Sequence, residues 1–280
     1  MKRMLPLLSL LLCLCAAGAA ELAQPEQKLI EETTHYEQPG VRIAIERWLY
    51  DFRKTDLRFF VAEIWLDDPT KLQTAFAGEE YSKKAVEATS AIAERHGAVL
   101  AVNGDYYNYK DDVGLVIRNG VLYRDKKNAN RDVLLVYSDG RFEGVPREDY
   151  VQGQGEQYVA QGVTQSFLFG PLLVQDGVAR ELPKKYYINT ADTIREPRTA
   201  IGQAADGHYV FVVADGRRAN WSDKGMALRE MQQVFLEKNC RVAYNLDGGG
   251  SATMILNGER VNRLSGSRER EVSDIVYIAP

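Results

Sequence analysis

The sequence predicts an α+β fold, a single domain with a mixed, mostly antiparallel sheet and flanking helices. Three observations lead to this prediction. Short runs in which apolar and polar residues alternate recur along the chain, a pattern typical of strands. Asn-Gly and Asp-Gly pairs separate several of these runs, which is typical of antiparallel hairpins. Only two segments, 85–96 and 224–238, have the spacing of amphipathic helices, so strands should form the centre of the fold.

The N-terminal residues predict export from the cytoplasm. Met1-Lys2-Arg3 precedes an apolar segment and small residues up to position 20, so we interpret residues 1–20 as a signal peptide. A lipoprotein anchor at Cys13 or Cys15 is less favoured, because bulky leucines precede both cysteines, and an uncleaved anchor stays open. Residues 21–40 are expected to form a polar arm, and residues 41–280 the folded domain. The predicted location is secreted or extracytoplasmic.

Composition narrows the choice of partners. The 280 residues are 45% hydrophobic and 26% charged, with a net charge of −4 that becomes two units more negative without Lys2 and Arg3. This acidic balance argues against nucleic acid as a partner, and we expect no membrane span in the mature chain. Cys240 would be the one cysteine left, and we expect it to be a buried structural thiol. The sequence carries no signal of an oligomeric state.

The predicted elements follow in order along the chain. Strands are expected at 41–45, 57–66 and 98–102, with the helix at 85–96 ending at Gly97. Turns are expected at five places: Asn119-Gly120, Ser138-Asp139-Gly140, Asp176-Gly177, Asp206-Gly207 and Asn257-Gly258. The helix at 224–238 should have Ser222 or Asp223 as its N-cap, and a last strand should cover 272–278.

The segment 241–254 is the least ordinary part of the sequence. An apolar run through Asn245 and Asp247 ends in Gly248, Gly249 and Gly250, followed by Ser251. A tight turn between strands is one interpretation, but such a turn needs fewer than three glycines. Consecutive glycines also allow a ligand to approach the backbone amides, which is the interpretation we favour.

Two carboxylates stand where predicted buried strands end. Asp105 follows the strand at 98–102, and Asp247 follows the run that begins at Val242; Asn103 and Asn245 lie two residues before them. Side chains at strand ends often reach functional crevices, although an Asx-turn at each position remains an alternative. Separately, Arg198 and Thr199 lead into a predicted strand and offer donors suited to a phosphate or carboxylate.

Several common catalytic sites are not supported by the sequence. It contains three histidines, none beside another candidate residue, which argues against a Ser-His-Asp enzyme and a histidine zinc site. The segment 249–253 fails the G-x-S-x-G pattern, because Thr253 takes the place of the second glycine. Neither a P-loop nor a dinucleotide-binding glycine motif is present.

Six motifs in order make the chain similar to a known family. They are Asn103-Gly104-Asp105-Tyr106-Tyr107, residues 114–120, Phe169-Gly170-Pro171-Leu172-Leu173, residues 197–202, Asp215-Gly216-Arg217 and residues 245–251. Over residues 57–280 this set resembles the phosphodiester glycosidase family, whose bacterial members include exopolysaccharide-related proteins. One departure is Asp105, which stands where the family motif has its second glycine.

The resemblance implies hydrolysis of the bond between a sugar's anomeric carbon and a phosphodiester oxygen in a cell-envelope or extracellular glycan. Asp247 would be the first catalytic candidate and Asp105 the second. The expected substrate-binding residues are Asn103, Arg198, Thr199, Asn245, Gly248, Gly249, Gly250 and Ser251. The glycine amides and Ser251 would help to hold the departing phosphate.

Two other functions stay open at this stage. The chain could be a non-catalytic glycan-binding or exopolysaccharide accessory protein with the same pocket. It could also be a metal-dependent phosphodiesterase, in which Asp105, Asn245 and Asp247 supply oxygen ligands to a divalent cation such as calcium. Since no loop has calcium-binding spacing, we expect no cofactor and no metal site.

Overall fold

The structure is a computed structural model of the chain. It describes residues 28–51, 56–107, 112–127, 130–184, 186, 188, 194–217 and 224–280. The predicted signal peptide at 1–20 lies outside these residues, as do Ser222 and Asp223. Among the described residues, no helix combines the length and apolar character needed to cross a membrane.

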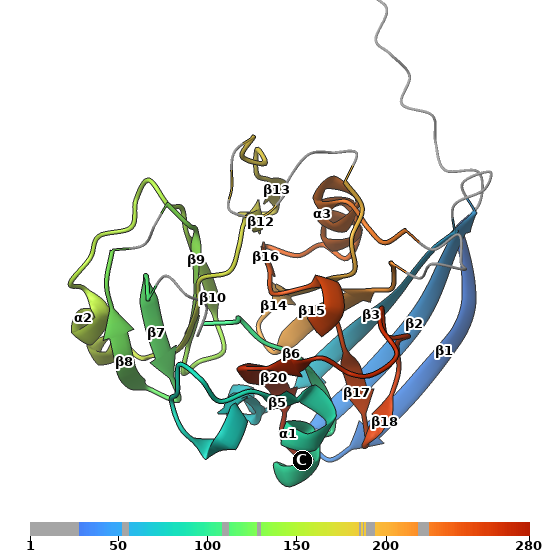
Figure 1. Cartoon of the computed structure of the whole chain (residues 1–280), viewed down its shortest axis with the longest axis horizontal. Helices are drawn as coiled ribbons and strands as arrows, with labels where there is room; N and C mark the ends of the chain where they lie inside the picture. Colours follow the sequence, from blue (N-terminus) through green and yellow to red (C-terminus); the bar gives the residue numbers. More distant parts are fainter. Residues whose placement is uncertain are drawn as a thin grey trace, which may run out of the picture.

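The largest sheet has eight strands. In spatial order they are β1 (Lys28–Gln38), β2 (Val41–Asp51), β3 (Asp56–Leu66), β15 (His208–Ala214), β14 (Arg198–Ala205), β16 (Val242–Asn245), β12 (Leu172–Gln175) and β13 (Val178–Ala179). Each neighbouring pair is antiparallel. Figure 1 shows β1, β2 and β3 as long blue strands along one side of the molecule. The strands expected at 41–45 and 57–66 are confirmed as parts of β2 and β3.

Strand β1 corrects the expectation of a polar arm at 21–40 from Lys28 onward, whereas residues 21–27 lie outside the described part of the chain. It pairs with β2 from Lys28↔Tyr50 to Gln38↔Val41 across a turn at Pro39-Gly40, where Gly40 has a φ of 77°. Most of its side chains are exposed, including Ile30 at 50%. A strand with so few buried side chains lacks the alternation that marks a half-buried strand, so its pairing with β2 leaves no clear signal in the sequence.

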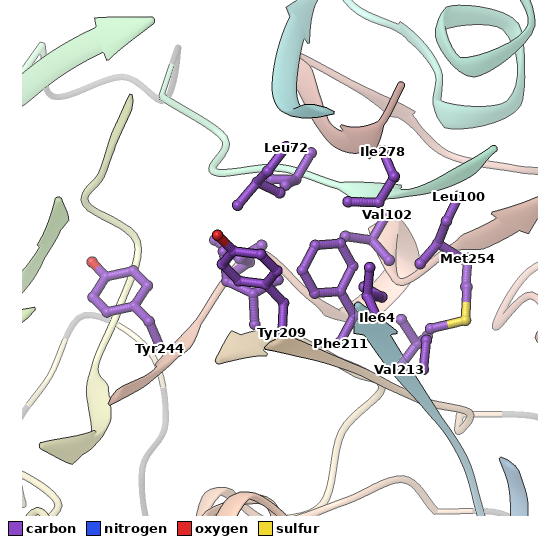
Figure 2. Close-up of a cluster of buried hydrophobic side chains, with 14 of the residues drawn as sticks. Ile64, Leu72, Leu100, Val102, Tyr209, Phe211, Val213, Tyr244, Met254 and Ile278 are labelled. Atoms are coloured by element: carbon purple, nitrogen blue, oxygen red, sulfur yellow. The ribbon is translucent and has the colours of Figure 1, made fainter. Parts of the chain in front are cut away.

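A second sheet of five strands packs against the large one. Its order is β18 (Glu259–Arg260), β17 (Met254–Leu256), β6 (Leu100–Asn103), β20 (Asp274–Ile278) and β4 (Leu72–Phe76). Figure 2 shows side chains of this sheet, among them Leu100, Val102 and Met254, packed against Phe211 and Val213 of the large sheet. Each such buried side chain contributes about 1.5–3 kcal/mol. This core fixes β6 and β16, the strands that end at the two candidate carboxylates.

Smaller sheets cover the sides of this core. One contains β10 (Phe142–Val145), β9 (Val133–Tyr137) and β11 (Val163–Phe167), and two others pair β7 (Leu115–Arg118) with β8 (Val121–Asp125) and β5 (Glu87–Ala88) with β19 (Glu271–Val272). The β7–β10 region is drawn in green in Figure 1. All five predicted turns are confirmed, and at Asn119-Gly120 both residues have positive φ, as a type I′ hairpin requires.

The helices are short. In the described part of the chain they are α1 (Thr89–Arg95), α2 (Gly155–Ala160) and α3 (Leu228–Glu237), and 3₁₀ turns occur at η1 (Pro69–Lys71), η2 (Ala77–Glu79) and η3 (Gly249–Ser251). The expected antiparallel pairing is confirmed throughout the described strands. The α+β prediction overestimated the share of helix, because strands dominate the fold and divide into several sheets. Cys240 is buried, as predicted, and burial raises the pKa of its thiol to about 12.

Both predicted helices begin later than expected. Residues 87–88 pair with β19 instead of joining α1. Met226 forms a bridge with Glu196, so the chain is extended until Ala227, which is the N-cap of α3. The prediction of Ser222 or Asp223 as the N-cap was therefore wrong. The Glu230 carboxylate accepts a hydrogen bond from the Ala227 amide at 2.9 Å and stabilises the first turn.

Candidate functional site

The site lies where β14 begins and β16 ends. Ala200 pairs with Asn245, and continuing this antiparallel register by two residues places Arg198 opposite Asp247. The Leu246 amide donates to the Thr199 carbonyl at 2.9 Å, and the Gly249 amide donates to the Pro197 carbonyl at 2.8 Å. The glycine loop and the segment 197–199 are therefore neighbours, as their predicted shared pocket requires.

The three glycines allow close packing around the loop. A Cβ on Gly248 would lie 2.7 Å from the Pro197 carbonyl oxygen, and a Cβ on Gly250 would lie 3.0 Å from Cδ of Arg270. Gly249 has a φ of 59°, within the left-handed region that glycine tolerates best. The backbone thus packs directly against two arginine-bearing segments.

Two of the three glycine amides are not free for the phosphate cradle that we expected. The Gly248 amide donates to Oδ1 of Asp247 at 2.8 Å, and the Gly249 amide is already paired with Pro197. These two amides instead orient the carboxylate and hold the loop in place. Any anion at this site would have to be bound mainly by side chains.

Asp247 is the partly buried carboxylate at the centre of the site. Burial raises the pKa of its carboxyl group to about 6, although hydrogen bonds from Ser251 and the Gly248 amide, and the charge of Arg270, favour the ionised form. A carboxyl group with this pKa changes protonation state just below neutral pH. Such a group can stabilise a developing positive charge or accept a proton from water.

Three arginines lie against the glycine loop, and the charge of one of them, Arg270, acts on Asp247. Arg198 is buried, which lowers the pKa of its guanidinium to about 10, and its Nε donates to the Met226 carbonyl at 3.3 Å. Arg217 comes within 3.4 Å of a Cβ built on Gly249 and is hydrogen-bonded to Glu196. Arg270 packs against Gly250. Of these three, the sequence predicted only Arg198 as a substrate-binding residue, although Arg217 belongs to one of the six motifs.

Asn103 and Thr199 are buried residues that support the backbone at Asp247 through hydrogen bonds. Nδ2 of Asn103 donates to the Asp247 carbonyl at 2.6 Å, while its Oδ1 accepts from the Thr199 hydroxyl at 2.6 Å and from the Thr253 amide at 3.2 Å. Both side chains are fully buried. The structure therefore brings these two predicted site residues to the glycine loop as supports that position Asp247.

Removing the Thr199 hydroxyl tests this support. Thr199→Val is expected to lower the free energy of unfolding by about 1–3 kcal/mol, because Oδ1 of Asn103 loses a buried donor. Urea unfolding would measure the loss. Thr34→Val, at an exposed position of β1, is the matched control and should change stability by less than about 0.5 kcal/mol. Equal effects of the two substitutions would contradict the supporting role.

Asp105 occupies a different environment from Asp247. Its two carboxylate oxygens accept hydrogen bonds from the Leu168 and Phe169 amides at 2.8–2.9 Å, and its side chain is completely buried. Burial raises the pKa of Asp105 to about 7, opposed by the nearby charge of Arg118. This carboxylate anchors a loop inside the protein, so only Asp247 of the two predicted carboxylates opens toward the site.

Behind Asp105 lies an ion-pair network that the sequence did not reveal. Nη2 of Arg118 lies 2.7 Å from Oδ2 of Asp274 and 3.7 Å from Oδ2 of Asp105, and Oδ1 of Asp274 accepts the Asp105 amide at 2.9 Å. All three side chains are buried in β-structure or at its end. The network is continuous with the site, because the Asp247 amide donates to the Gly104 carbonyl at 3.2 Å.

Of the two remaining predicted residues, only Ser251 contacts Asp247. Ser251 is buried and hydrogen-bonded to Asp247. Asn245 is also buried, and its Nδ2 donates to the Gly170 carbonyl at 2.7 Å. Within the part of the chain that the structure describes, no group of three or more His, Cys, Asp and Glu side chains is arranged to hold a metal ion.

Comparison with known proteins identifies a family and two relatives of this chain. A family model described as "Phosphodiester glycosidase" matches residues 96–279. An uncharacterized protein of the SPbeta prophage of Bacillus subtilis is 30% identical over 197 residues, which is 69% of this chain and 30% of that protein. The mouse N-acetylglucosamine-1-phosphodiester alpha-N-acetylglucosaminidase is 28% identical over 180 residues, or 62% of this chain and 33% of that protein. The chain thus spans about a third of the length of these curated relatives.

A solved structure shares the fold. The zebrafish N-acetylglucosamine-1-phosphodiester alpha-N-acetylglucosaminidase catalytic domain, auto-inhibited by its pro-peptide, superimposes with a TM-score of 0.66. The match covers 91% of this chain and 88% of the zebrafish chain, at 19% sequence identity. The arrangement of sheets described above is therefore similar to that of this domain.

Proposed function

This chain belongs to the phosphodiester glycosidase family, and on that premise we propose that it hydrolyses the bond between a sugar's anomeric carbon and the oxygen of a phosphodiester. The proposed substrate is a sugar-1-phosphodiester in a cell-envelope or extracellular glycan, reached after export through the leader at 1–20. One observation carries the proposal: Asp247, a carboxylate whose pKa is raised to about 6, lies in a loop bordered by three arginines.

The positive arginines suit the departing phosphate, and the negative Asp247 suits the sugar. The departing phosphomonoester is a weak base, so it needs electrostatic stabilisation more than a proton. Arg198, Arg217 and Arg270 supply positive charge and hydrogen-bond donors for it. Asp247 supplies negative charge for the oxocarbenium-like sugar and can accept the proton of the attacking water.

Roles for the other candidates follow from their contacts. Asp105 is assigned as a positioning residue, because both of its oxygens are engaged by backbone amides. Asn103, Thr199 and the Gly248 amide hold Asp247 in its orientation. Ser251 donates a hydrogen bond to the carboxylate that favours its ionised form.

The raised pKa of Asp247 predicts a pH dependence. Above pH 6 the group is ionised and active, whereas below pH 6 it is progressively protonated, so kcat/KM should fall about tenfold per pH unit on the acidic side. A pH profile of initial rates would show this limb with an apparent pKa near 6. A profile that stays flat down to pH 4.5 would contradict the assigned role of Asp247.

A product assay tests the function itself. The purified mature protein would be incubated with a panel of sugar-1-phosphodiesters, and free sugar and phosphomonoester would be measured. We expect both products in equal amounts, with Arg198→Ala strongly reduced. Binding without turnover across the panel would favour a glycan-binding protein instead, and turnover abolished by a chelator and restored by a cation would favour a metal-dependent enzyme.

A further inference from the structure

A cavity of about 540 Å³ lies between α3 and the segment 179–184, which begins at the end of β13. Its volume falls within the range of about 300–1,000 Å³ that is typical of small-molecule sites. Among the described residues that line it, Arg180, Lys184 and Arg229 are basic and Glu181 alone is acidic. Since the whole chain has a net charge of −4, this excess of positive charge is local to the cavity and favours an anionic group there.

The neutral part of the lining suits sugar units beside such an anion. Gln233 is an exposed residue of α3 and carries an amide that can exchange hydrogen bonds with hydroxyl groups. Leu182, Pro183 and Leu236 offer apolar surface against which the C–H face of a sugar ring can pack. Positive charge, an amide and apolar surface together match a phosphate within a glycan better than a free inorganic ion, which has no apolar part.

The wall of the cavity is fixed to the helix that faces it. Nε2 of Gln232, a buried side chain of α3, donates to the carbonyls of Leu173 at 2.9 Å and Arg180 at 2.7 Å. The Arg180 amide donates to the same Leu173 carbonyl at 2.9 Å, and Nη2 of Arg180 lies 3.1 Å from Oε1 of Glu148. Figure 1 shows α3 and β13 at the same end of the molecule. Because these contacts hold the wall before any ligand binds, the cavity is preorganised.

The cavity is close to the candidate site, because the segment that enters α3 borders both. Nε of Arg198 donates to the Met226 carbonyl at 3.3 Å, and Arg229, which lines the cavity, follows Met226 by three residues. Three residues of chain span at most about 11 Å. A chain of sugars and phosphates that passes Asp247 and Arg198 can therefore continue along the start of α3 into the cavity.

We propose that this cavity is a second phosphate site, and that the substrate is a glycan whose units are joined by repeated phosphodiester links. Lys184 and Arg229 bind a phosphate that does not react, while the link that is cleaved lies at Asp247. The inference rests on the proposed function, because it names the class of substrate on which that function acts.

Three substrates test the second phosphate site. The first is two hexoses joined by one phosphodiester, and the second is three hexoses joined by two. The third equals the second, except that the link that is not cleaved is a methylphosphonate, which has the same length but no charge. Wild-type kcat/KM should be at least about tenfold higher for the second compound than for the other two, because charge-assisted hydrogen bonds hold its additional phosphate.

Charge-neutral variants of the cavity assign this preference to its cations. In the double variant Lys184→Gln/Arg229→Gln the ratio between the second and third compounds should fall to near one. The matched control, Lys127→Gln/Arg260→Gln, removes two positive charges at exposed positions that do not line the cavity, and it should keep the wild-type ratio.

A binding measurement separates this inference from the proposed function. Titration calorimetry in the Asp247→Asn background, with the second and third compounds, should give a ratio of about tenfold in Kd, and Lys184→Gln/Arg229→Gln should abolish this ratio. Absence of hydrolysis by the wild type combined with this ratio in Kd would remove the proposed function and keep the second phosphate site. A ratio near one before the cavity is changed, a ratio that survives Lys184→Gln/Arg229→Gln, or an equal loss in the matched control would overturn the site.

Discussion

Asp247→Asn is expected to lower kcat/KM for a sugar-1-phosphodiester by about 1,000-fold or more, because it removes the negative charge assigned to the transition state. The substitution keeps an oxygen that can accept the Gly248 amide, so the loop should be preserved. Initial rates of sugar release would measure the loss. Asp206→Asn, in an exposed hairpin, is the matched control and should retain wild-type activity.

The same substitution should make the folded protein more stable at neutral pH. The pKa of Asp247 is about 6 in the folded state, above the value of about 3.9 expected in the unfolded chain, so ionisation opposes folding as pH rises through this interval. Asp247→Asn removes this cost and should add about 3 kcal/mol at pH 7.5 and almost nothing at pH 4. Lost activity together with lost stability would point to a structural role for Asp247 instead.

Arg118→Met is expected to produce the largest loss of stability, about 3–5 kcal/mol, because it leaves two buried carboxylates without their cation. The loss should be smaller at pH 5 than at pH 8. The reason is that the pKa of Asp105 is raised to about 7, so at low pH this group is already neutral. Urea unfolding at the two pH values would measure both effects.

Two further variants separate charge from packing at Arg118. Asp274→Asn in the Arg118→Met background removes one of the unpaired charges and should recover part of the lost stability. Arg141→Met breaks an exposed ion pair with Glu143 and should cost at most about 1 kcal/mol. A similar cost for Arg118→Met and Arg141→Met would show that the buried network does not contribute as described.

Local signals in the sequence predicted much of the fold. Asn119-Gly120 specifies its own hairpin through positive φ, and Gly40 similarly allows the turn before β2. In contrast, β1 is mostly exposed and joins the sheet by pairing with β2. Helix α3 begins late because the bridge between Glu196 and Met226 keeps the preceding chain extended. These boundaries depend on contacts between distant segments, which a local pattern does not contain.

Individual residues of the candidate site could be predicted from the sequence, but their spatial arrangement could not. The sequence marked Asp247 and Arg198 separately, and the pairing of β14 with β16 brings them together. Asp105 and Asp247 have the same sequence pattern, an aspartate after a buried strand. This pattern does not reveal whether the carboxylate accepts hydrogen bonds from backbone amides or is partly exposed at the site. Arg270 could be recognised only once its packing against Gly250 was visible.

The position of bond cleavage tests the central claim most directly. Hydrolysis would be carried out in ¹⁸O-labelled water, and the released phosphomonoester would be analysed by mass spectrometry before the free sugar exchanges its anomeric oxygen. Attack at the anomeric carbon, with Asp247 supporting the sugar and the arginines supporting the phosphate, predicts ¹⁸O in the sugar and none in the phosphomonoester. Label in the phosphomonoester would show cleavage at phosphorus and would contradict the assignment as a glycosidase.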